Sequence, residues 1–152
     1  MDLIYKNFLQ PTPQHYQLLL DADPSKKLID AYLPQSICIE AYTQREMAGV
    51  VILLPTRPET IEIVNIAVVP EQRNKGIGQA LIEHSIQCAK ERHYQIIEIG
   101  TGSTSFGQLY LYQKCGFRMV SIDTDFFVKH YSEPIIENKL ILKDMVRLRL
   151  NL

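Results

Sequence analysis

The sequence predicts an α+β domain in which a mixed, mostly antiparallel sheet is flanked by helices. Three strand-like stretches follow one another between residues 36 and 69, and helix and strand patterns then alternate. The longest strand pattern, residues 60–69, is followed directly by a loop that carries two glycines. The chain has 152 residues, of which 46% are hydrophobic and 22% charged, as expected of a single globular domain. We therefore expect residues 1–152 to form one domain.

Hydrophobic periodicity and the positions of Gly and Pro set the expected elements. The first helix should present Tyr16, Leu19 and Leu20 on one face. Polar turns are expected at residues 43–46, 55–59 and 100–104, and Gly116 should end a helix in the left-handed region. The expected strands are 3–8, 36–41, 47–54, 60–69, 95–99, 117–122 and 144–150, and the expected helices are 14–23, 27–32, 77–89 and one that begins near Phe106.

Composition limits the partners of the chain. A formal net charge of −1 argues against non-specific binding to nucleic acid or to an anionic membrane. No apolar run approaches the roughly 20 residues of a membrane span, and the N-terminal residues do not resemble a signal peptide. The three cysteines are widely spaced, without metal-ligand spacing, and are typical of reduced thiols. We therefore expect a cytoplasmic protein that holds no metal.

The loop after the longest strand pattern has the features of an anion site. Its sequence is Arg73, Asn74, Lys75, Gly76, Ile77 and Gly78, and a helix begins within it. Glycines let the backbone approach a ligand, and the free N–H groups and dipole of a helix start favour a phosphate. Arg73 and Lys75 add positive charge. The alternative is a glycine turn that only joins a strand to a helix.

Two motifs together identify a family. The loop lacks the Lys-Ser/Thr of a Walker loop and, with Leu81 in place, the third glycine of a dinucleotide fingerprint. Its Gln/Arg-x-x-Gly-x-Gly pattern resembles the pyrophosphate loop of the GNAT acyl-CoA N-acyltransferases. Residues 110–117, Tyr-Leu-Tyr-Gln-Lys-Cys-Gly-Phe, resemble the motif that closes the GNAT core. Residues 36–122 carry this resemblance.

The resemblance implies acetyl-CoA as co-substrate and a gap between the strands that end near Val69 and start near Gln95. Backbone groups along the free strand edge would bond the pantetheine amides, and one backbone N–H there would polarise the thioester carbonyl. Ser105 stands where the family often has a pantetheine-binding Asn, and Asn74 stands where many members have Gly. The implied coenzyme-binding residues are Ile66, Ala67, Val68, Val69, Arg73, Asn74, Lys75, Gly76, Ile77, Gly78, Ser105 and Tyr112.

The resemblance also suggests two catalytic side chains. Tyr112 occupies the position of the family's proton donor to the leaving thiolate; the alternative is a half-buried helix tyrosine whose hydroxyl is hydrogen-bonded. Glu62 is the candidate base that deprotonates the amine; the alternatives are a solvated carboxylate on a strand, or proton removal through ordered water.

The acceptor amine is open at this stage. His130 and Tyr131 are candidate pocket residues, with ordinary packing as the alternative, whereas Phe126 and Phe127 are expected in the core. An acidic wall would suit an aminoglycoside or a polyamine, although such charges are more often a solvated surface; its candidate members are Asp123, Asp125, Glu133 and Glu137. A CoA-binding sensor without turnover and a nucleotide-phosphate protein of another fold remain alternatives. The β-rich C-terminal end is a candidate surface for a homodimer.

Overall fold

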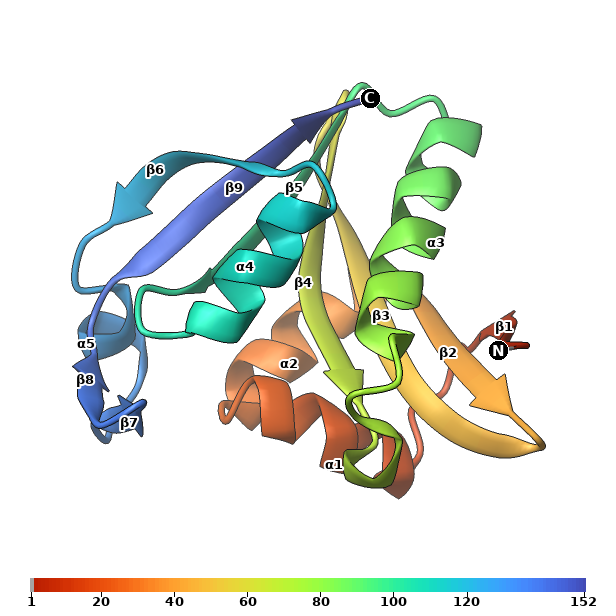
Figure 1. Ribbon diagram of the computed structural model, residues 1–152, viewed down its shortest axis with the longest axis horizontal. Coiled ribbons are helices and arrows are strands. Elements are labelled where there is room, and N and C mark those ends of the chain that lie inside the picture. Colours follow the sequence, from red (N-terminus) through yellow and green to blue (C-terminus); the bar gives the residue numbers. More distant parts are fainter. Residues whose placement is uncertain (1) are drawn as a thin grey trace.

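The computed structural model describes residues 2–152 as a seven-stranded sheet and a separate two-stranded hairpin (Figure 1). The sheet order is β1-β2-β3-β4-β5-β9-β6, and within it only β4 and β5 pair in parallel. This mixed, mostly antiparallel sheet confirms the predicted α+β class. The strands are β1 (Ile4–Asn7), β2 (Ile37–Thr43), β3 (Glu46–Arg57), β4 (Thr60–Val68), β5 (Ile96–Gly102), β6 (Arg118–Asp123), β7 (Ile135–Glu137), β8 (Leu140–Leu142) and β9 (Met145–Asn151).

Helices cover both faces of the sheet and bury two apolar clusters. The helices are α1 (Pro13–Ala22), α2 (Lys26–Tyr32), α3 (Ile77–Glu91), α4 (Phe106–Lys114) and α5 (Phe126–His130), with 3₁₀ turns at Leu33–Gln35 and Pro70–Gln72. One cluster packs α3 and α4 against the sheet through residues such as Leu81 and Tyr112. The other packs α1 and α2 through Leu19 and Ile29. Burial of these side chains supplies the main driving force for folding.

Two local predictions were wrong. Strand β3 continues through Pro55 to Arg57, because Pro55 is paired with Ile61 of the neighbouring strand. Strand β5 extends through the expected polar turn to Gly102, because β9 supplies a partner for each of these residues. The predicted face of α1 does pack on the core, because Leu19 is buried and Tyr16 and Leu20 are partly buried against the same cluster; His15 and Leu18 are buried beside them.

A bulge in β4 separates the two halves of the sheet. Ile52 pairs with Asn65 but Leu53 pairs with Ile63, so Val64 is an extra residue in β4. The pairing of β4 with β5 ends at the same point, because Ile63↔Ile99 is the last pair. Figure 1 shows the two strands side by side at one end of the sheet and apart at the other. The bulge bends β4 away from β5, and among residues 2–152 no strand pairs with this edge of β4 beyond the bulge.

The extra residue also changes which side chains share a face. In a regular strand, residues three apart point to opposite faces. Here Ile61 and Ile63 lie in the cluster under α3 and α4, whereas Asn65 donates to Leu19 O on the α1 side. Glu62, which alternates with Ile61 and Ile63, therefore lies on the same face as Asn65.

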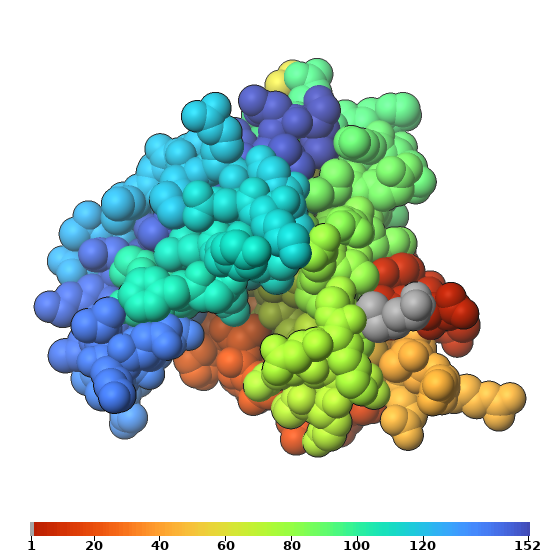
Figure 2. All heavy atoms as spheres, in the orientation of Figure 1, coloured from red at the N-terminus to blue at the C-terminus, as the bar shows by residue number. Residues whose placement is uncertain are grey.

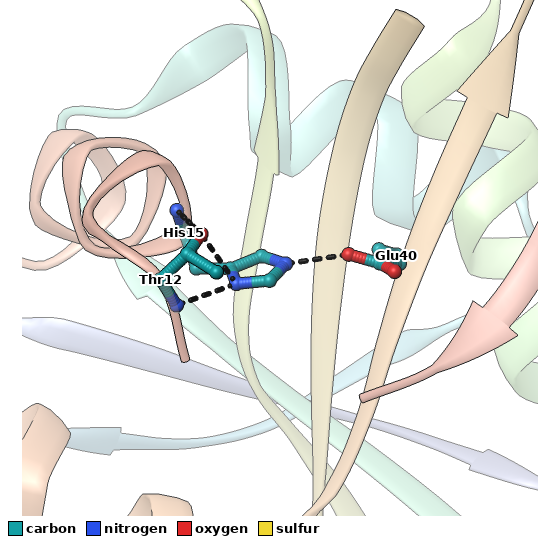
Figure 3. Close-up of polar contacts among 3 residues, drawn as sticks. All are labelled: Thr12, His15 and Glu40. Atoms are coloured by element: carbon teal, nitrogen blue, oxygen red, sulfur yellow. Dashed lines mark hydrogen bonds and ion pairs between the residues drawn. The ribbon is translucent and has the colours of Figure 1, made fainter. Parts of the chain in front are cut away.

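The start of α1 is bound to β2 through a buried histidine (Figure 3). The backbone N–H of Thr12 donates to His15 Nδ1 at 2.9 Å, so the ring proton is on Nε2, which donates to Glu40 Oε2 at 2.5 Å. Thr12 Oγ1 accepts from His15 N at 3.3 Å and completes a capping box. The ring is 3% exposed and stacks on Phe8 at 3.8 Å. Each polar atom of the ring therefore has a structural role.

We expect His15→Ala to lower the free energy of unfolding by about 2–4 kcal/mol. The change leaves a cavity, removes the acceptor of Thr12 N–H, and leaves the partly buried Glu40 carboxylate without its donor. Urea unfolding at neutral pH measures the effect, and His130→Ala is the matched control because His130 is exposed. A loss smaller than about 1 kcal/mol would contradict a structural role for His15.

Candidate active site

A cavity of about 440 Å³ lies where β4 and β5 separate. Its walls come from both strands, from α4, from the segment between α1 and α2, and from the C-terminal segment around α5 and the hairpin. Figure 2 shows the surface hollowed between the blue-green atoms of α4 and the yellow-green atoms of the loop after β4. The polar and aromatic lining residues are Asp21, Asp23, Tyr32, Glu62, Asn65, Thr101, Ser105, Gln108, Tyr112, Phe126, Phe127, Tyr131, Glu137 and Arg147.

The glycine loop has the geometry of an anion site. Asn74 and Gly76 adopt positive φ values of 63° and 82°, which turn the chain into α3. Gly76 is the N-cap and offers no side-chain acceptor, so the first N–H groups of α3 remain available. Apart from Gly76 and its neighbours along the chain, no heavy atom of residues 2–152 lies within 4 Å of the position that a Gly76 Cβ would occupy. The Ile77 side chain is buried in the core, so only its backbone can meet a ligand.

The two cations of this loop lie against neighbouring acceptors. Arg73 Nε donates to Val68 O at 3.3 Å, and Lys75 Nζ donates to Gln72 Oε1 at 3.4 Å. Arg73 is exposed and also lies 3.9 Å from Asp21 Oδ2. Both side chains are long and exposed enough to turn toward an anion at the start of α3.

Only half of the predicted strand edge is free. Val69 N donates to Ala48 O at 2.8 Å, and Ala67 is the register partner of Val50, so these residues bond β3. Because backbone groups of successive strand residues point to opposite sides, those of Ile66 and Val68 face the gap. The contact of Arg73 with Val68 O agrees with this orientation. The edge that an extended ligand can use therefore consists of Ile66 and Val68.

Tyr112 reaches the cavity from α4. Its side chain is 3% exposed and packs against Phe117, and among residues 2–152 its hydroxyl makes no hydrogen bond. Burial, followed by the nearby Cys115, raises the pKa of Tyr112 above its ordinary value of 10.0. The phenol therefore keeps its proton at neutral pH and has a free hydroxyl to donate. The predicted alternative of a hydrogen-bonded hydroxyl does not fit this structure.

Glu62 lies half-buried on the cavity wall. Burial raises its pKa above the ordinary 4.5; Arg147 opposes the rise, Glu98 adds to it, and Arg57 opposes it. Its register partner Glu98 is itself paired with Arg57 at 3.1 Å and Arg149 at 2.9 Å. Glu62 makes no ion pair within the described part of the chain. A carboxylate with a raised pKa and no partner is suited to accept a proton.

We expect Glu62→Gln to remove the acid limb of the kcat/KM profile, which should lie above pH 4.5 because the folded-state pKa is raised. The same variant should unfold at a higher urea concentration at pH 7–8, because ionising a half-buried carboxyl destabilises the fold. At about pH 4, where both states are largely protonated, the gain should vanish. Glu46→Gln, at an exposed strand end, is the control. An unchanged acid limb would exclude Glu62 as the general base.

Ser105 was predicted to contact pantetheine, but its hydroxyl is engaged elsewhere. It is buried and donates to Glu137 Oε1, which also accepts from Thr104 Oγ1 at 3.4 Å. Asn138 Nδ2 donates to Thr104 O at 2.7 Å and fixes the β7–β8 turn to the start of α4. In this structure Ser105 therefore orients a cavity carboxylate, and its contact with pantetheine stays a prediction.

The C-terminal segment differs from its sequence-based description. Phe126 and Phe127 line the cavity and are only partly buried, so their assignment to the core was wrong. Tyr131 lines the cavity, whereas His130 is exposed, packs on the Phe126 ring and lies outside the lining. The Phe126 ring meets the Phe127 ring edge to face, and the Phe127 ring stacks with Tyr131.

The acidic wall also differs. Of its four predicted members only Glu137 lines the cavity; Asp123 is paired with Arg147 at 3.2 Å, and Asp125 and Glu133 are exposed. The sequence reasoning missed two lining carboxylates, Asp21 and Asp23, at the end of α1. Two acids at a helix C-terminus, where the dipole disfavours them, were the available signal.

Residues 2–152 contain no cluster of three or more His, Cys, Asp or Glu side chains arranged for a metal ion. In the same range no helix is both long and apolar enough to cross a membrane.

The fold and the cavity can be set beside known proteins. A model of the acetyltransferase (GNAT) family matches residues 2–117. The chain belongs to the GNAT family. It is 53% identical over 137 residues to the Bacillus subtilis protein named uncharacterized N-acetyltransferase YvbK, an alignment that covers 90% of this chain and 88% of that relative.

Two solved GNAT-type structures are similar along nearly the whole chain. A Bacillus subtilis acetyltransferase in complex with CoA has 49% identity and a TM-score of 0.96, with 99% of each chain covered. An Elizabethkingia anophelis GNAT acetyltransferase with acetyl-CoA bound has 45% identity and a TM-score of 0.95, with 99% of this chain and 98% of that chain covered. These likenesses confirm the GNAT fold and exclude a nucleotide-phosphate protein of another fold.

Proposed function

We propose that this protein is an acetyl-CoA-dependent N-acetyltransferase whose acceptor is a primary amine of a peptide or of an aminoglycoside- or polyamine-like small molecule. The observation that carries the proposal is a cavity at the β4–β5 gap, lined by both Glu62 and Tyr112 and adjoining the free edge of β4. One group suits a proton acceptor and the other a proton donor, which is what acyl transfer from a thioester to an amine requires.

Residues of the loop and of β4 would hold the coenzyme. The first N–H groups of α3 suit the pyrophosphate, with Lys75 and a reoriented Arg73 adding charge. The free edge at Ile66 and Val68 suits the pantetheine amides, which can bond a strand edge as another strand would. The space around Gly76 leaves room for a ligand against the backbone.

The cavity side chains would then carry the protons. Glu62 accepts the proton that an alkylammonium group, with a pKa of about 10.4, must lose before it attacks the thioester. A backbone N–H of the free β4 edge polarises the thioester carbonyl. The new C–N bond forms as the C–S bond breaks, and Tyr112 donates a proton to the departing thiolate. The second proton, which the nitrogen loses as it becomes an amide, restores the Tyr112 phenol. The coenzyme supplies the activated acyl group.

The charge of the cavity supports a cationic acceptor. Four carboxylates line it, from Asp21, Asp23, Glu62 and Glu137, and the only lining cation of residues 2–152 is Arg147. Arg147 is paired with Asp123 outside the lining. An ammonium group would therefore enter a region of negative potential.

We place the protein in the cytoplasm. Cys38, Cys88 and Cys115 are free thiols, which suits a reducing compartment.

Isothermal titration calorimetry with acetyl-CoA, CoA, NAD and ATP tests the coenzyme part of the proposal. We expect micromolar binding of the two CoA compounds and no binding of NAD or ATP. Release of free CoA thiol in the presence of a panel of amines then tests turnover. Binding without thiol release for any amine would favour the alternative, a catalytically silent CoA-binding sensor or interaction module. Absence of CoA binding would overturn the proposal.

A further inference from the structure

The C-terminal end of α1 brings two carboxylates to the cavity wall. Asp21 lies in the last turn of α1 and Asp23 is its C-cap, and both line the cavity. The last turn of this helix contains no basic residue. Because the helix dipole places negative partial charge at this end, two carboxylates are unfavourable here unless a cation joins them.

Neutral donors hold Asp23 in one orientation. Its Oδ1 accepts from Tyr131 OH at 2.8 Å and from Ser25 N at 3.1 Å, and its Oδ2 accepts from Tyr32 OH at 3.4 Å. The contact with Tyr131 joins segments 108 residues apart in the chain. Hydrogen bonds orient the carboxylate but leave its charge uncompensated, so Asp23 is a fixed negative charge on the wall.

Asp21 has only a weak cationic neighbour. Arg73 Nη2 lies 3.9 Å from Asp21 Oδ2, and the two side chains are 54% and 50% exposed. Exposed pairs at this distance contribute little. In the coenzyme-bound protein the same guanidinium would be drawn toward the pyrophosphate, which leaves Asp21 without a cation.

Asn65 adds an acceptor that lacks a donor on this wall. Its Nδ2 donates to Leu19 O at 3.1 Å and to Tyr32 OH at 3.0 Å. Leu19 O can only accept, so the amide orientation is determined, and its oxygen is Oδ1. This residue lines the cavity and is 4% exposed, and its Oδ1 is buried and has no hydrogen-bond partner among residues 2–152. Buried acceptors are rarely left unpaired, and the uncompensated oxygen adds negative potential to this wall beside the two carboxylates.

The bulge at Val64 brings Asn65 to the side of β4 on which the proposed base Glu62 lies. Because of the extra residue, Asn65 lies on the same face of β4 as Glu62, although the two are three positions apart. Aromatic side chains of Tyr32, Phe127 and Tyr131 line the same cavity, and such rings accept alkyl chains and cations. One ligand can therefore meet Glu62 and the end of α1 together.

We propose that Asp21, Asp23 and Asn65 form a subsite for a second ammonium group of the acceptor, so that the preferred acceptor is a small alkyl diamine or longer polyamine. The reacting amino group lies at Glu62, and the second ammonium group lies at the end of α1 between the two carboxylates. The uncompensated Asn65 Oδ1 adds negative potential that favours a cation there. This inference rests on the proposed N-acetyltransferase function.

Paired substrates test the subsite. The kcat/KM values are measured by thiol release for diamines from 1,3-diaminopropane to 1,6-diaminohexane and for monoamines of equal chain length. Two amino groups give a diamine only a twofold statistical advantage. We expect the best diamine to exceed its monoamine by about tenfold or more, which is typical of one fixed charge contact.

Substitutions then locate the effect. Asp23→Asn keeps an oxygen for Tyr131 but removes the charge, and it should bring the diamine-to-monoamine ratio close to two. Asp21→Asn, at an exposed position, is a second variant should Asp23→Asn fail to fold. Asp30→Asn is the control, because Asp30 is exposed on α2, is paired with Lys26 and lies outside the cavity. It should leave the ratio unchanged.

The outcomes separate this inference from the proposed function. Thiol release with some amines, but with a ratio near two or a ratio that neither Asp21→Asn nor Asp23→Asn lowers, overturns the subsite alone. No thiol release with any amine overturns the proposed function, and the subsite with it.

Discussion

Gly78→Asp is expected to weaken acetyl-CoA binding by at least about 100-fold while the protein still folds. The substitution places a carboxylate in the first turn of α3, where the free N–H groups are proposed to bind the pyrophosphate. Like charges brought together at such a site cost several kcal/mol. An acidic residue in the first turn of a helix is otherwise favourable, so helix stability is not the reason for the loss.

The same position provides the matched control. A Cβ at Gly78 would lie 3.6 Å from Leu111 Cδ2 and 3.9 Å from Val68 Cγ2, which are ordinary contacts. Gly78→Ala should therefore keep its acetyl-CoA affinity within a few-fold. Gly76→Glu should also abolish binding, but with φ at +82° it adds backbone strain, which makes its result harder to assign. Calorimetry measures the acetyl-CoA affinity of each variant. Full affinity in a folded Gly78→Asp protein would contradict an anion site at the start of α3.

Tyr112→Phe is expected to lower kcat by roughly 10- to 1,000-fold and to leave acetyl-CoA affinity unchanged. The hydroxyl makes no hydrogen bond among the described residues, and burial raises its pKa, so it can act as a donor at neutral pH. Because no bond is lost on its removal, the free energy of unfolding should change by less than about 1 kcal/mol.

Tyr110→Phe is the control for this prediction. Tyr110 lies on the same helix but is 67% exposed and is not among the cavity residues. Its variant should match the parent in rate and in stability. If Tyr112→Phe also turned over at the parental rate, water or another group would have to protonate the thiolate. If the loss of kcat came with a loss of the free energy of unfolding of more than about 1 kcal/mol, Tyr112 would have a structural role instead.

Local patterns were sufficient for several parts of this protein. The glycine loop and the left-handed Gly116 each depend on a few neighbouring residues and were predicted. The paired motifs at residues 73–78 and 110–117 predicted the GNAT family, and the family match confirms it. Most strands and helices also followed from periodicity, because each buries one face against a large core.

The errors occurred where a distant partner decides local structure. β9 converts the polar turn at residues 100–102 into strand by pairing with it. Ser105 has a distant partner of the same kind, since Glu137, which lies 32 residues away, accepts its hydroxyl, and its contact with the coenzyme stays a prediction. Phe126 and Phe127 are apolar and read as core, yet the elements around α5 leave them on a cavity wall.

The sequence by itself determined the class of fold, the family and the types of side chain available for catalysis, since these depend on periodicity and short motifs. Only the tertiary structure decided which polar side chains line the same cavity. The bulge at Val64 puts Glu62 and Asn65 on one face, and the end of α1 brings Asp21 and Asp23 to the same cavity. A one-residue shift in strand register exchanges the faces of every later side chain, and neither such a shift nor contacts between distant segments leave a periodic signal in the sequence.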